Sequence, residues 1–196
     1  LKHGLNVFCE KILTRDAIST RELYALARRR GKTLFTDYTY MFSESINLIK
    51  KKITCIGPIK RINAEIAQYG KFYANATAVE TIGVHMLSAI HYIMSDYSLI
   101  HFTEYGETND SILIGVAGSI SVYIRSSLYS NVKRRFIEFI GTNGIITANM
   151  MGNENVVEQY FNGKKTTYSF DEGNNLGRAV REFNESINMH NSINEQ

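Results

Sequence analysis

The chain has 196 residues, of which 44% are hydrophobic and 21% charged, and this composition excludes a disordered chain in favour of a soluble globular protein. The formal charge of +3 is small, and the sequence has neither a zinc-finger spacing nor an aromatic ribonucleoprotein motif, which argues against nucleic-acid binding.

The first segment of the chain is predicted to be a strand, a helix and a second strand. Residues 1–4 resemble the last turn of a helix, so we expect the chain to begin inside a fold. Residues 5–9 form an apolar run, Thr14 can cap a helix that ends at Gly31, and residues 33–36 resume as a strand. This spacing predicts a βαβ unit with parallel strands.

The middle of the chain is predicted to contain two helices with a strand between them. Ser43 can cap a helix over residues 42–52, and alternating apolar residues around Ala64 indicate a half-buried strand. Residues 79–94 carry the strongest helical pattern. Its expected buried face consists of Ile82, Met86, Ala89 and Ile93. A polar stripe beside that face consists of Thr81, His85, Ser88 and Tyr92, spaced by four, three and four residues.

The rest of the chain is predicted to be mostly strands. The expected ranges are 99–104, 112–126, 132–140, 145–149, 156–161 and 166–170, followed by a closing helix over residues 176–189. The fold class is therefore α/β plus α+β. We expect a βαβ domain over residues 1–53 and an open-faced, mostly antiparallel sheet domain over residues 54–196.

Cysteine content and hydropathy indicate the compartment. Cys9 and Cys55 are the only cysteines and show no metal-binding spacing, so we expect no disulfide framework, no metal site and a reducing, cytoplasmic location. No apolar stretch reaches about 18 residues, so no membrane span is expected.

Polar side chains that follow the two parallel strands are the first candidates for chemistry. Glu10 and Lys11 follow the first strand, where ligands of open α/β sheets bind. The lysine could orient a sugar hydroxyl and the glutamate could accept ribose hydroxyls, or the two could form an ordinary exposed ion pair. Tyr38 and Tyr40 follow the second strand and could line a cofactor or sugar site, or pack a junction between layers.

The histidine of the polar stripe is the second candidate. His85 could be a general base beside the hydroxyl of Thr81, or a structural histidine bonded to a backbone carbonyl. The sequence contains no GxGxxG motif, and we place Gly115 and Gly118 inside one strand, so no phosphate-binding loop is visible.

The order of these segments resembles the Gfo/Idh/MocA (glucose-fructose oxidoreductase and inositol dehydrogenase) family. Glu10-Lys11-Ile12 resembles the family's Glu-Lys-Pro strand end, residues 37–43 its entry to the second domain, and residues 83–88 its catalytic-histidine helix. The resemblance covers almost the whole chain. It implies a Rossmann domain whose first half is absent here, followed by a substrate-binding sheet domain that often mediates oligomer formation.

The resemblance also implies a function for the full-length protein. It would be an NAD- or NADP-dependent oxidoreductase that oxidises a ring hydroxyl of a sugar or nucleotide-linked sugar, or reverses that step. Lys11 and His85 would be catalytic, Glu10, Lys11 and Tyr38 would bind the cofactor, and Lys11, Tyr40, Thr81 and His85 would bind the substrate. A homo-oligomer through the sheet face is expected, and the 196-residue piece alone is expected to be inactive.

Two positions depart from the family pattern. Ile12 replaces the proline after the lysine, so we expect a trans bond there, because a cis bond before a non-proline residue costs about 2.5 to 4 kcal/mol. Thr81 replaces the aspartate one turn before the histidine, and in a regular α-helix Glu80 lies about 100° around from it. These departures motivate an alternative, a non-catalytic sugar-binding or assembly protein of the same fold.

Overall fold

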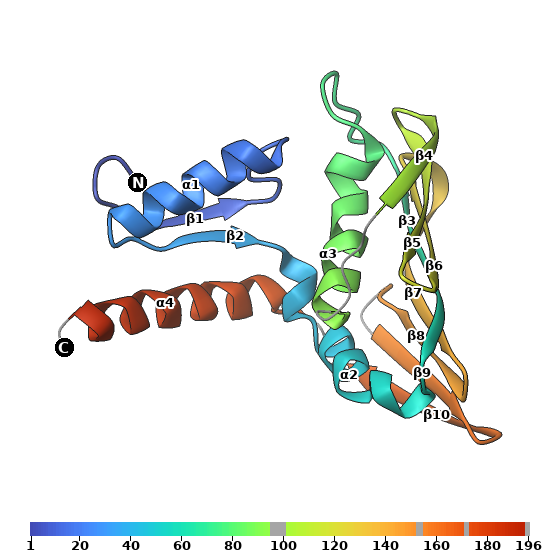
Figure 1. The fold of residues 1–196 in the computed structure, drawn as a ribbon. Coiled ribbons are helices and arrows are strands. Elements are labelled where there is room, and N and C mark those ends of the chain that lie inside the picture. Colours follow the sequence, from blue (N-terminus) through green and yellow to red (C-terminus); the bar gives the residue numbers. More distant parts are fainter. Residues whose placement is uncertain (95–100, 152–154, 171–172, 195–196) are drawn as a thin grey trace. The chain divides into compact units, whose positions relative to one another are not determined.

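The computed structural model describes residues 1–94, 101–151, 155–170 and 173–194 (Figure 1). Its elements have the predicted α/β plus α+β class. The chain divides into two compact units, Leu1–Phe42 with Asn174–Gln196, and Ser43–Gly173. This division differs from the expected boundary after residue 53, because the helix that begins at residue 44 buries its apolar side within the second unit and the closing helix belongs to the first.

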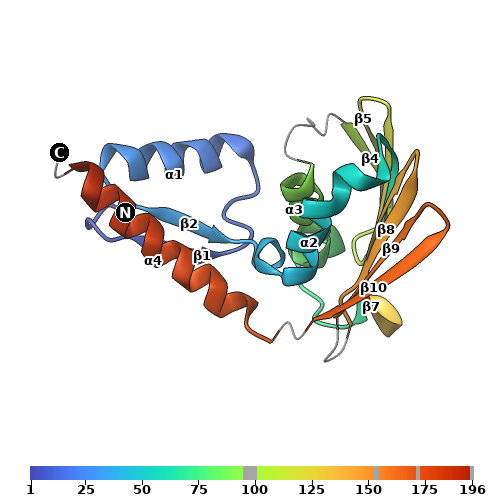
Figure 2. The ribbon, with the colours of Figure 1, turned by 90° about the horizontal axis from the view of Figure 1, so that it is seen from below.

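The first unit is built on two parallel strands, as the βαβ prediction requires. Strand β1 (Val7–Glu10) pairs with β2 (Leu34–Asp37), which places Glu10 beside Asp37 at the end of both strands. Helices α1 (Ala17–Arg29) and α4 (Asn175–Asn194) lie on opposite faces of this pair (Figures 1 and 2). A 3-10 turn, Thr39–Phe42, follows β2.

Aromatic stacking holds the first unit together. The ring of Phe8 on β1 stacks on Phe35 of β2 at 5.5 Å, and both rings meet Phe183 of α4 edge-on. Helix α1 is capped by Asp16 rather than by the predicted Thr14, because the Asp16 carboxylate accepts a hydrogen bond from the Ser19 backbone N–H at 2.7 Å.

The second unit is a sheet of eight strands covered by helices. After α2 (Glu44–Lys52), capped by Ser43 as predicted, come a 3-10 turn (Ile53–Ile56), β3 (Ile59–Tyr69), a π-helical turn (Val79–Gly83) and α3 (Val84–Ile93). The remaining strands are β4 (His101–Glu107), β5 (Asp110–Ala117), β6 (Ile120–Ser127), β7 (Tyr129–Gly141), β8 (Gly144–Asn149), β9 (Asn155–Phe161) and β10 (Lys164–Phe170).

The sheet is mostly antiparallel, as predicted, with one parallel pair. Its strand order is β10-β9-β8-β7-β3-β6-β5-β4, and β3 is parallel to β6. The prediction of one strand over residues 112–126 was wrong. The chain turns back between β5 and β6, where Gly118 adopts a φ of +62° that favours glycine.

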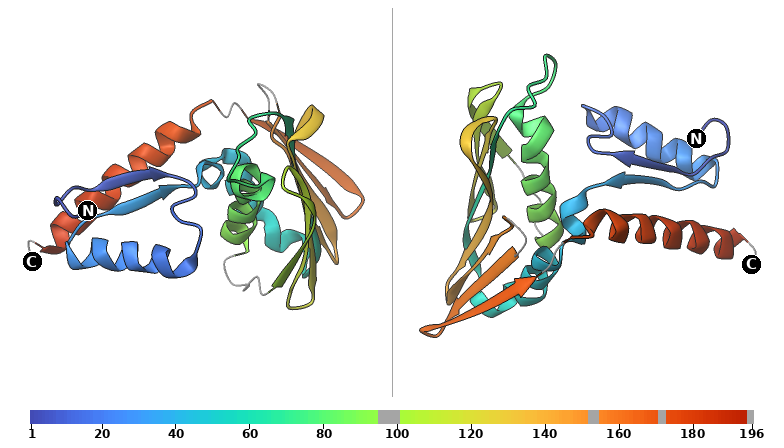
Figure 3. Two further views of the ribbon diagram at one scale, coloured as in Figure 1. Left: turned by 90° about the horizontal axis from the view of Figure 1, so that it is seen from above. Right: turned by 180° about the vertical axis from the view of Figure 1, so that it is seen from behind.

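One face of the sheet is covered and the other is open. Helices α2 and α3 lie on the same side of the sheet (Figures 2 and 3). On that side the core contains the predicted residues of β3 and of the third helix, namely Ile62, Ala64, Ile66, Ile82, Met86, Ala89 and Ile93. The opposite face carries no helix among the described residues of this unit.

The open face mixes exposed apolar side chains with ion pairs. Arg125 of β6 bridges Glu65 of β3 at 3.0 Å and Asp110 of β5 at 3.2 Å. Large apolar side chains that remain exposed on this face are Tyr105, Ile114, Val116, Tyr123 and Tyr160. No helix within the described residues is long and apolar enough to span a membrane.

Candidate functional site

The predicted lysine lies at the end of the parallel strand pair. Glu10 is the last residue of β1 and is exposed, while Lys11 follows it and is half-buried. Burial lowers the pKa of the Lys11 ammonium, and the neighbouring Glu10 carboxylate offsets part of that effect. Lys11 therefore loses its proton more readily than an exposed lysine.

The peptide bond between Lys11 and Ile12 is cis. The expectation of a trans bond, drawn from Ile12 standing where the family has proline, was wrong. That expectation used residue type alone, whereas the geometry of a peptide bond depends also on the backbone around it.

A buried carboxylate stands beside this lysine segment. Asp37 ends β2, is fully buried and is the strand partner of Glu10. Loss of solvent raises the pKa of Asp37, and the nearby Glu10 charge raises it further. The Thr39 hydroxyl donates to Oδ2 at 3.3 Å, and Oδ1 has no hydrogen-bond partner among the described residues. The sequence predicts the segment of residues 37–40 at this strand end, but it gives Asp37 itself no role in the site.

The two predicted tyrosines follow the second strand. Tyr38 comes directly after β2 and is half-buried, and desolvation raises the pKa of its phenol. Tyr40 lies in the 3-10 turn and is also half-buried. The first unit thus gathers Glu10, Lys11, Asp37 and Tyr38 at the ends of its parallel strands, where carboxylates and an ammonium can orient the hydroxyls of a ligand.

The histidine lies on α3 in the second unit, directly after the π-helical turn. There the Val84 N–H bonds to the Val79 carbonyl, five residues back, instead of following the α-helical pattern. The expectation that Glu80 lies about 100° around from Thr81 was based on a regular α-helix, and in this π-helical turn the angle between successive residues is smaller because each turn holds more residues.

Local hydrogen bonds fix the start of this helical segment. The Glu80 carboxylate accepts from the Thr77 N–H at 2.8 Å, and the Thr77 hydroxyl accepts from the Glu80 N–H at 3.2 Å. This reciprocal arrangement is a capping box, which satisfies two backbone N–H groups that the first turn leaves open.

The hydroxyls of the predicted polar stripe bond within the second unit. The Thr81 hydroxyl donates a hydrogen bond to the Thr77 carbonyl at 2.8 Å, and the Ser88 hydroxyl donates one to the His85 carbonyl at 3.0 Å. Tyr92 donates to the side-chain carbonyl of Asn47 on α2 at 2.8 Å. The stripe predicted from spacing thus includes three structural hydroxyls beside a half-buried histidine.

The predicted site residues belong to two groups. Glu10, Lys11, Tyr38 and Tyr40 lie in the first unit, and Thr81 and His85 lie in the second. Cys9 and Cys55 are free thiols. Within the described part of the chain, no group of three or more His, Cys, Asp or Glu side chains could hold a metal ion.

Comparison with known proteins shows the fold. No family model and no curated protein matches the chain. It is similar in structure to the 3-ketoreductase KijD10 of Actinomadura kijaniata in complex with TDP-benzene and NADP, with a TM-score of 0.83 at 17% identity over 96% of this chain. A protein from Magnetospirillum magnetotacticum, inferred to be an oxidoreductase, has a TM-score of 0.78 at 21% identity over 95% of this chain.

The likeness extends over nearly all of this chain but only part of its neighbours. An oxidoreductase from Pseudomonas syringae aligns with 88% of this chain at 15% identity, with a TM-score of 0.75. The chain spans 64% of the length of the Actinomadura ketoreductase, 66% of the Magnetospirillum protein and 51% of the Pseudomonas protein. It therefore shares the fold of between half and two thirds of each of these proteins.

Proposed function

We propose that the full-length protein is an NAD- or NADP-dependent oxidoreductase that oxidises a ring hydroxyl of a sugar or nucleotide-linked sugar, or reduces the corresponding ketone. The observation that carries this proposal is the half-buried Lys11 after a parallel strand, with Glu10 and Asp37 at the same strand ends. The chain shares its fold with a ketoreductase that was crystallised with TDP-benzene and NADP. A cytoplasmic location is part of the proposal, supported by the two free cysteines.

The residues present fit the nicotinamide end of such a cofactor. Glu10 can accept hydrogen bonds from ribose hydroxyls, and Lys11 and the half-buried Tyr38 ring can contact the nicotinamide portion. The described residues offer no phosphate-binding loop, so the fit covers that end only. When bound, the nicotinamide accepts or supplies the hydride.

His85 and Lys11 would each have a role in the chemistry of the substrate. In the oxidation direction, neutral His85 takes the proton of the hydroxyl as general base, and in reduction its imidazolium returns that proton. The Lys11 ammonium can donate a hydrogen bond that orients a sugar hydroxyl and can stabilise negative charge that develops on its oxygen.

Two further residues would bind the sugar. Tyr40 offers a half-buried ring and a hydroxyl. Because Thr81 already donates its proton to the Thr77 carbonyl, it can contribute to binding only by accepting a hydrogen bond from a sugar hydroxyl.

The open face of the sheet would form the homo-oligomer. Exposed apolar side chains occur on it in neighbouring strands, including Ile114 of β5 and Tyr123 of β6, which are direct partners in register. Contiguous exposed apolar surface of this kind is typical of protein contact sites.

Substitution of His85 in the full-length protein tests the proposal. His85→Ala should lower turnover of nucleotide-linked hexoses by about 10²- to 10⁴-fold while NADPH binding, followed by nicotinamide fluorescence, is unchanged. His91→Ala is the matched control, because His91 lies on the same helix and is exposed.

The alternative, a non-catalytic sugar-binding or assembly protein, predicts a different outcome. It is favoured by Thr81, whose hydroxyl is bonded to the backbone and which cannot stabilise a charged imidazole as a carboxylate would. Sugar binding without turnover in the unaltered full-length protein, and no binding of NADH or NADPH, would support this alternative and refute the oxidoreductase.

A further inference from the structure

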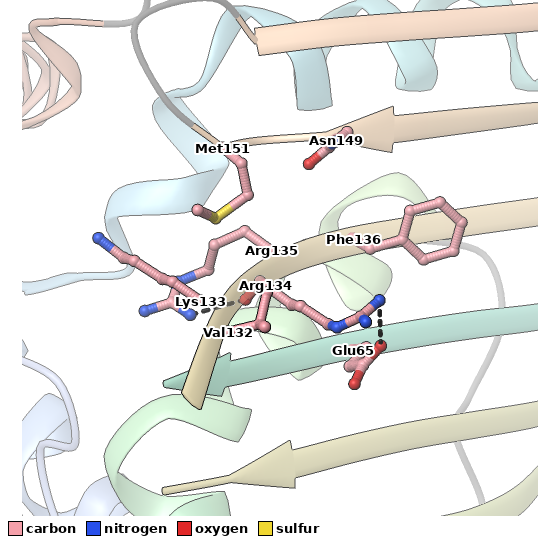
Figure 4. Close-up of a pocket in the computed structure, with 8 residues that line it drawn as sticks. All are labelled: Glu65, Val132, Lys133, Arg134, Arg135, Phe136, Asn149 and Met151. Atoms are coloured by element: carbon pink, nitrogen blue, oxygen red, sulfur yellow. Dashed lines mark hydrogen bonds and ion pairs between the residues drawn. The ribbon is translucent and has the colours of Figure 1, made fainter. Parts of the chain in front are cut away.

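A basic pocket opens in the second unit at the start of β7, and none of the residues proposed for catalysis, cofactor binding or sugar binding lines it (Figure 4). Its volume is about 510 Å³, which lies within the range of small-molecule sites. Three consecutive cations, Lys133, Arg134 and Arg135, line it together with one carboxylate, Glu65. The pocket is therefore strongly positive for its size.

An irregularity in strand pairing creates this pocket. The register of β3 and β7 is regular from Arg61 to Ala67, which lies opposite Arg134, and the next pair is Tyr69 opposite Tyr129, so β3 advances two residues while β7 advances five. The Ser130 side chain stabilises the extra loop of β7, since its hydroxyl donates to the Val132 carbonyl at 2.8 Å and accepts from the Val132 N–H at 3.3 Å. The extra residues leave Lys133 exposed beside the pocket.

The carboxylate in the pocket is already shared. One oxygen of Glu65 pairs with Arg125 at 3.0 Å, and the other lies 3.8 Å from the Arg134 guanidinium, too far for a hydrogen bond. Arg134 is 56% exposed and keeps its N–H donors for another acceptor. Figure 4 shows Arg134 extending toward Glu65, whereas Lys133 and Arg135 extend the other way.

The third cation is buried with neutral partners only. Arg135 is 8% exposed, and its guanidinium donates to the carbonyls of Ala67 and Arg134 and to the side chain of Gln68. Among the described residues, no carboxylate forms an ion pair with Arg135 or with Lys133. Buried charges are normally paired, so a positive charge held here without a counter-ion favours an anion as the ligand.

Apolar side chains complete the lining. Phe136 and Met151 are both half-buried at the pocket, so they offer a surface that bare phosphate would not use. We propose that this pocket binds a small organic phosphate, with Lys133 and Arg134 as ligands of the phosphate group and Phe136 and Met151 in contact with its apolar body. Charge-assisted hydrogen bonds from lysine and arginine are the contacts that phosphate oxygens form most strongly.

Two probes that differ by one ring test the proposal. Phenyl phosphate and inorganic phosphate are titrated into the ¹⁵N-labelled chain, and backbone amide shifts are followed by NMR. We expect both to move the amides of residues 132–136, with phenyl phosphate binding more tightly because its ring meets Phe136 and Met151. Equal affinities would refute the apolar contact, and shifts confined to residues outside the pocket would overturn the proposal.

A matched pair of variants assigns the binding to these cations. Lys133→Ala/Arg134→Ala should weaken phenyl phosphate binding at least about tenfold, because it removes two charge-assisted contacts. Lys60→Ala/Arg61→Ala removes another exposed lysine–arginine pair, on β3, and should change affinity by less than about twofold. Equal weakening by both variants, tighter binding of a single-stranded RNA than of phenyl phosphate, or no saturable binding by the unaltered chain would overturn the proposal.

Discussion

At the scale of single residues, two ionisable groups at the ends of the parallel strands have pKa values that are shifted towards the neutral form of the group. Burial lowers the pKa of the Lys11 ammonium and raises that of the Asp37 carboxyl, so each shift favours the neutral form. Perturbed groups of this kind cluster at ligand sites, although ordinary packing also produces them. The neighbouring Glu10 carboxylate opposes the shift at Lys11 and adds to the one at Asp37.

The raised pKa of Asp37 makes stability depend on pH in a predictable direction. Because the folded state holds the proton more tightly than the unfolded chain, this contribution is complete below the ordinary value of 3.8 and is lost as pH rises through the raised value. Asp37→Asn removes the buried charge and should stabilise the protein at neutral pH, with a smaller gain near pH 4. Urea unfolding at the two pH values measures this difference.

An exposed aspartate provides the control for that measurement. The pKa of Asp16 is lowered by hydrogen bonds from Ser19, so the Asp16 carboxylate stabilises the folded state at neutral pH. The Asp16→Asn variant should therefore be less stable than the unaltered protein at neutral pH, by a margin that shrinks in acid. This pH dependence is opposite to that expected for Asp37→Asn. If Asp37→Asn instead lowers the stability by the same amount at both pH values, the raised pKa of the buried Asp37 carboxyl is contradicted.

Single residues were predicted unevenly from the sequence. Lys11 and Glu10 were placed correctly at a strand end, because apolar runs mark the ends of short buried strands. The helix cap was assigned to Thr14 instead of Asp16, since both residue types cap helices and the choice depends on backbone angles that the sequence does not reveal. Asp37 was noticed only as part of a motif, because its burial depends on tertiary packing.

At the scale of elements, the π-helical turn before His85 depends on close packing against the sheet. A methyl group added at Gly83 would overlap the side-chain oxygen of Ser126 on β6. That oxygen is buried without a hydrogen-bond partner among the described residues. The turn can therefore approach β6 only because residue 83 lacks a side chain.

This packing predicts the effects of three substitutions. Gly83→Ala should destabilise the protein by about 1 to 3 kcal/mol through overpacking. Ser126→Ala alone should be nearly neutral because no hydrogen bond is lost, and it should recover part of the loss in the double variant. Chemical denaturation of the single and double variants measures the coupling, and strict additivity would show that the two sites do not interact.

Elements were predicted better than the details within them. The helix around His85, its apolar face and the alternation of β3 followed from periodicity, which burial imposes on any amphipathic segment. The π turn did not, because it depends on the fit between the helix and β6. The β5–β6 hairpin was missed for a related reason, since a glycine between two apolar runs also occurs inside strands.

At the scale of the whole molecule, the open sheet face gives the proposed oligomer a specific test. Ile114→Glu places a charge among exposed apolar side chains and should convert the oligomer of the full-length protein to monomer in light scattering, because an interface buries that charge without a partner. Leu176→Glu alters an exposed apolar residue of α4 in the other unit and should leave the oligomer intact. A monomeric unaltered protein, or an unchanged Ile114→Glu variant, would refute this interface.

Among the described strands, β3 alone links two sets, β4–β6 on one side and β7–β10 on the other, each made of strands that follow one another along the chain. Its contacts reach far along the chain, with Glu65 bonded 60 residues away to Arg125 and Asn63 bonded 75 residues away to Glu138. During synthesis at about 5–20 residues per second, β3 therefore leaves the ribosome several seconds before either partner strand does. Until then the apolar side chains of β3 have no neighbouring strands, and the rate of synthesis sets how long the nascent chain exposes them.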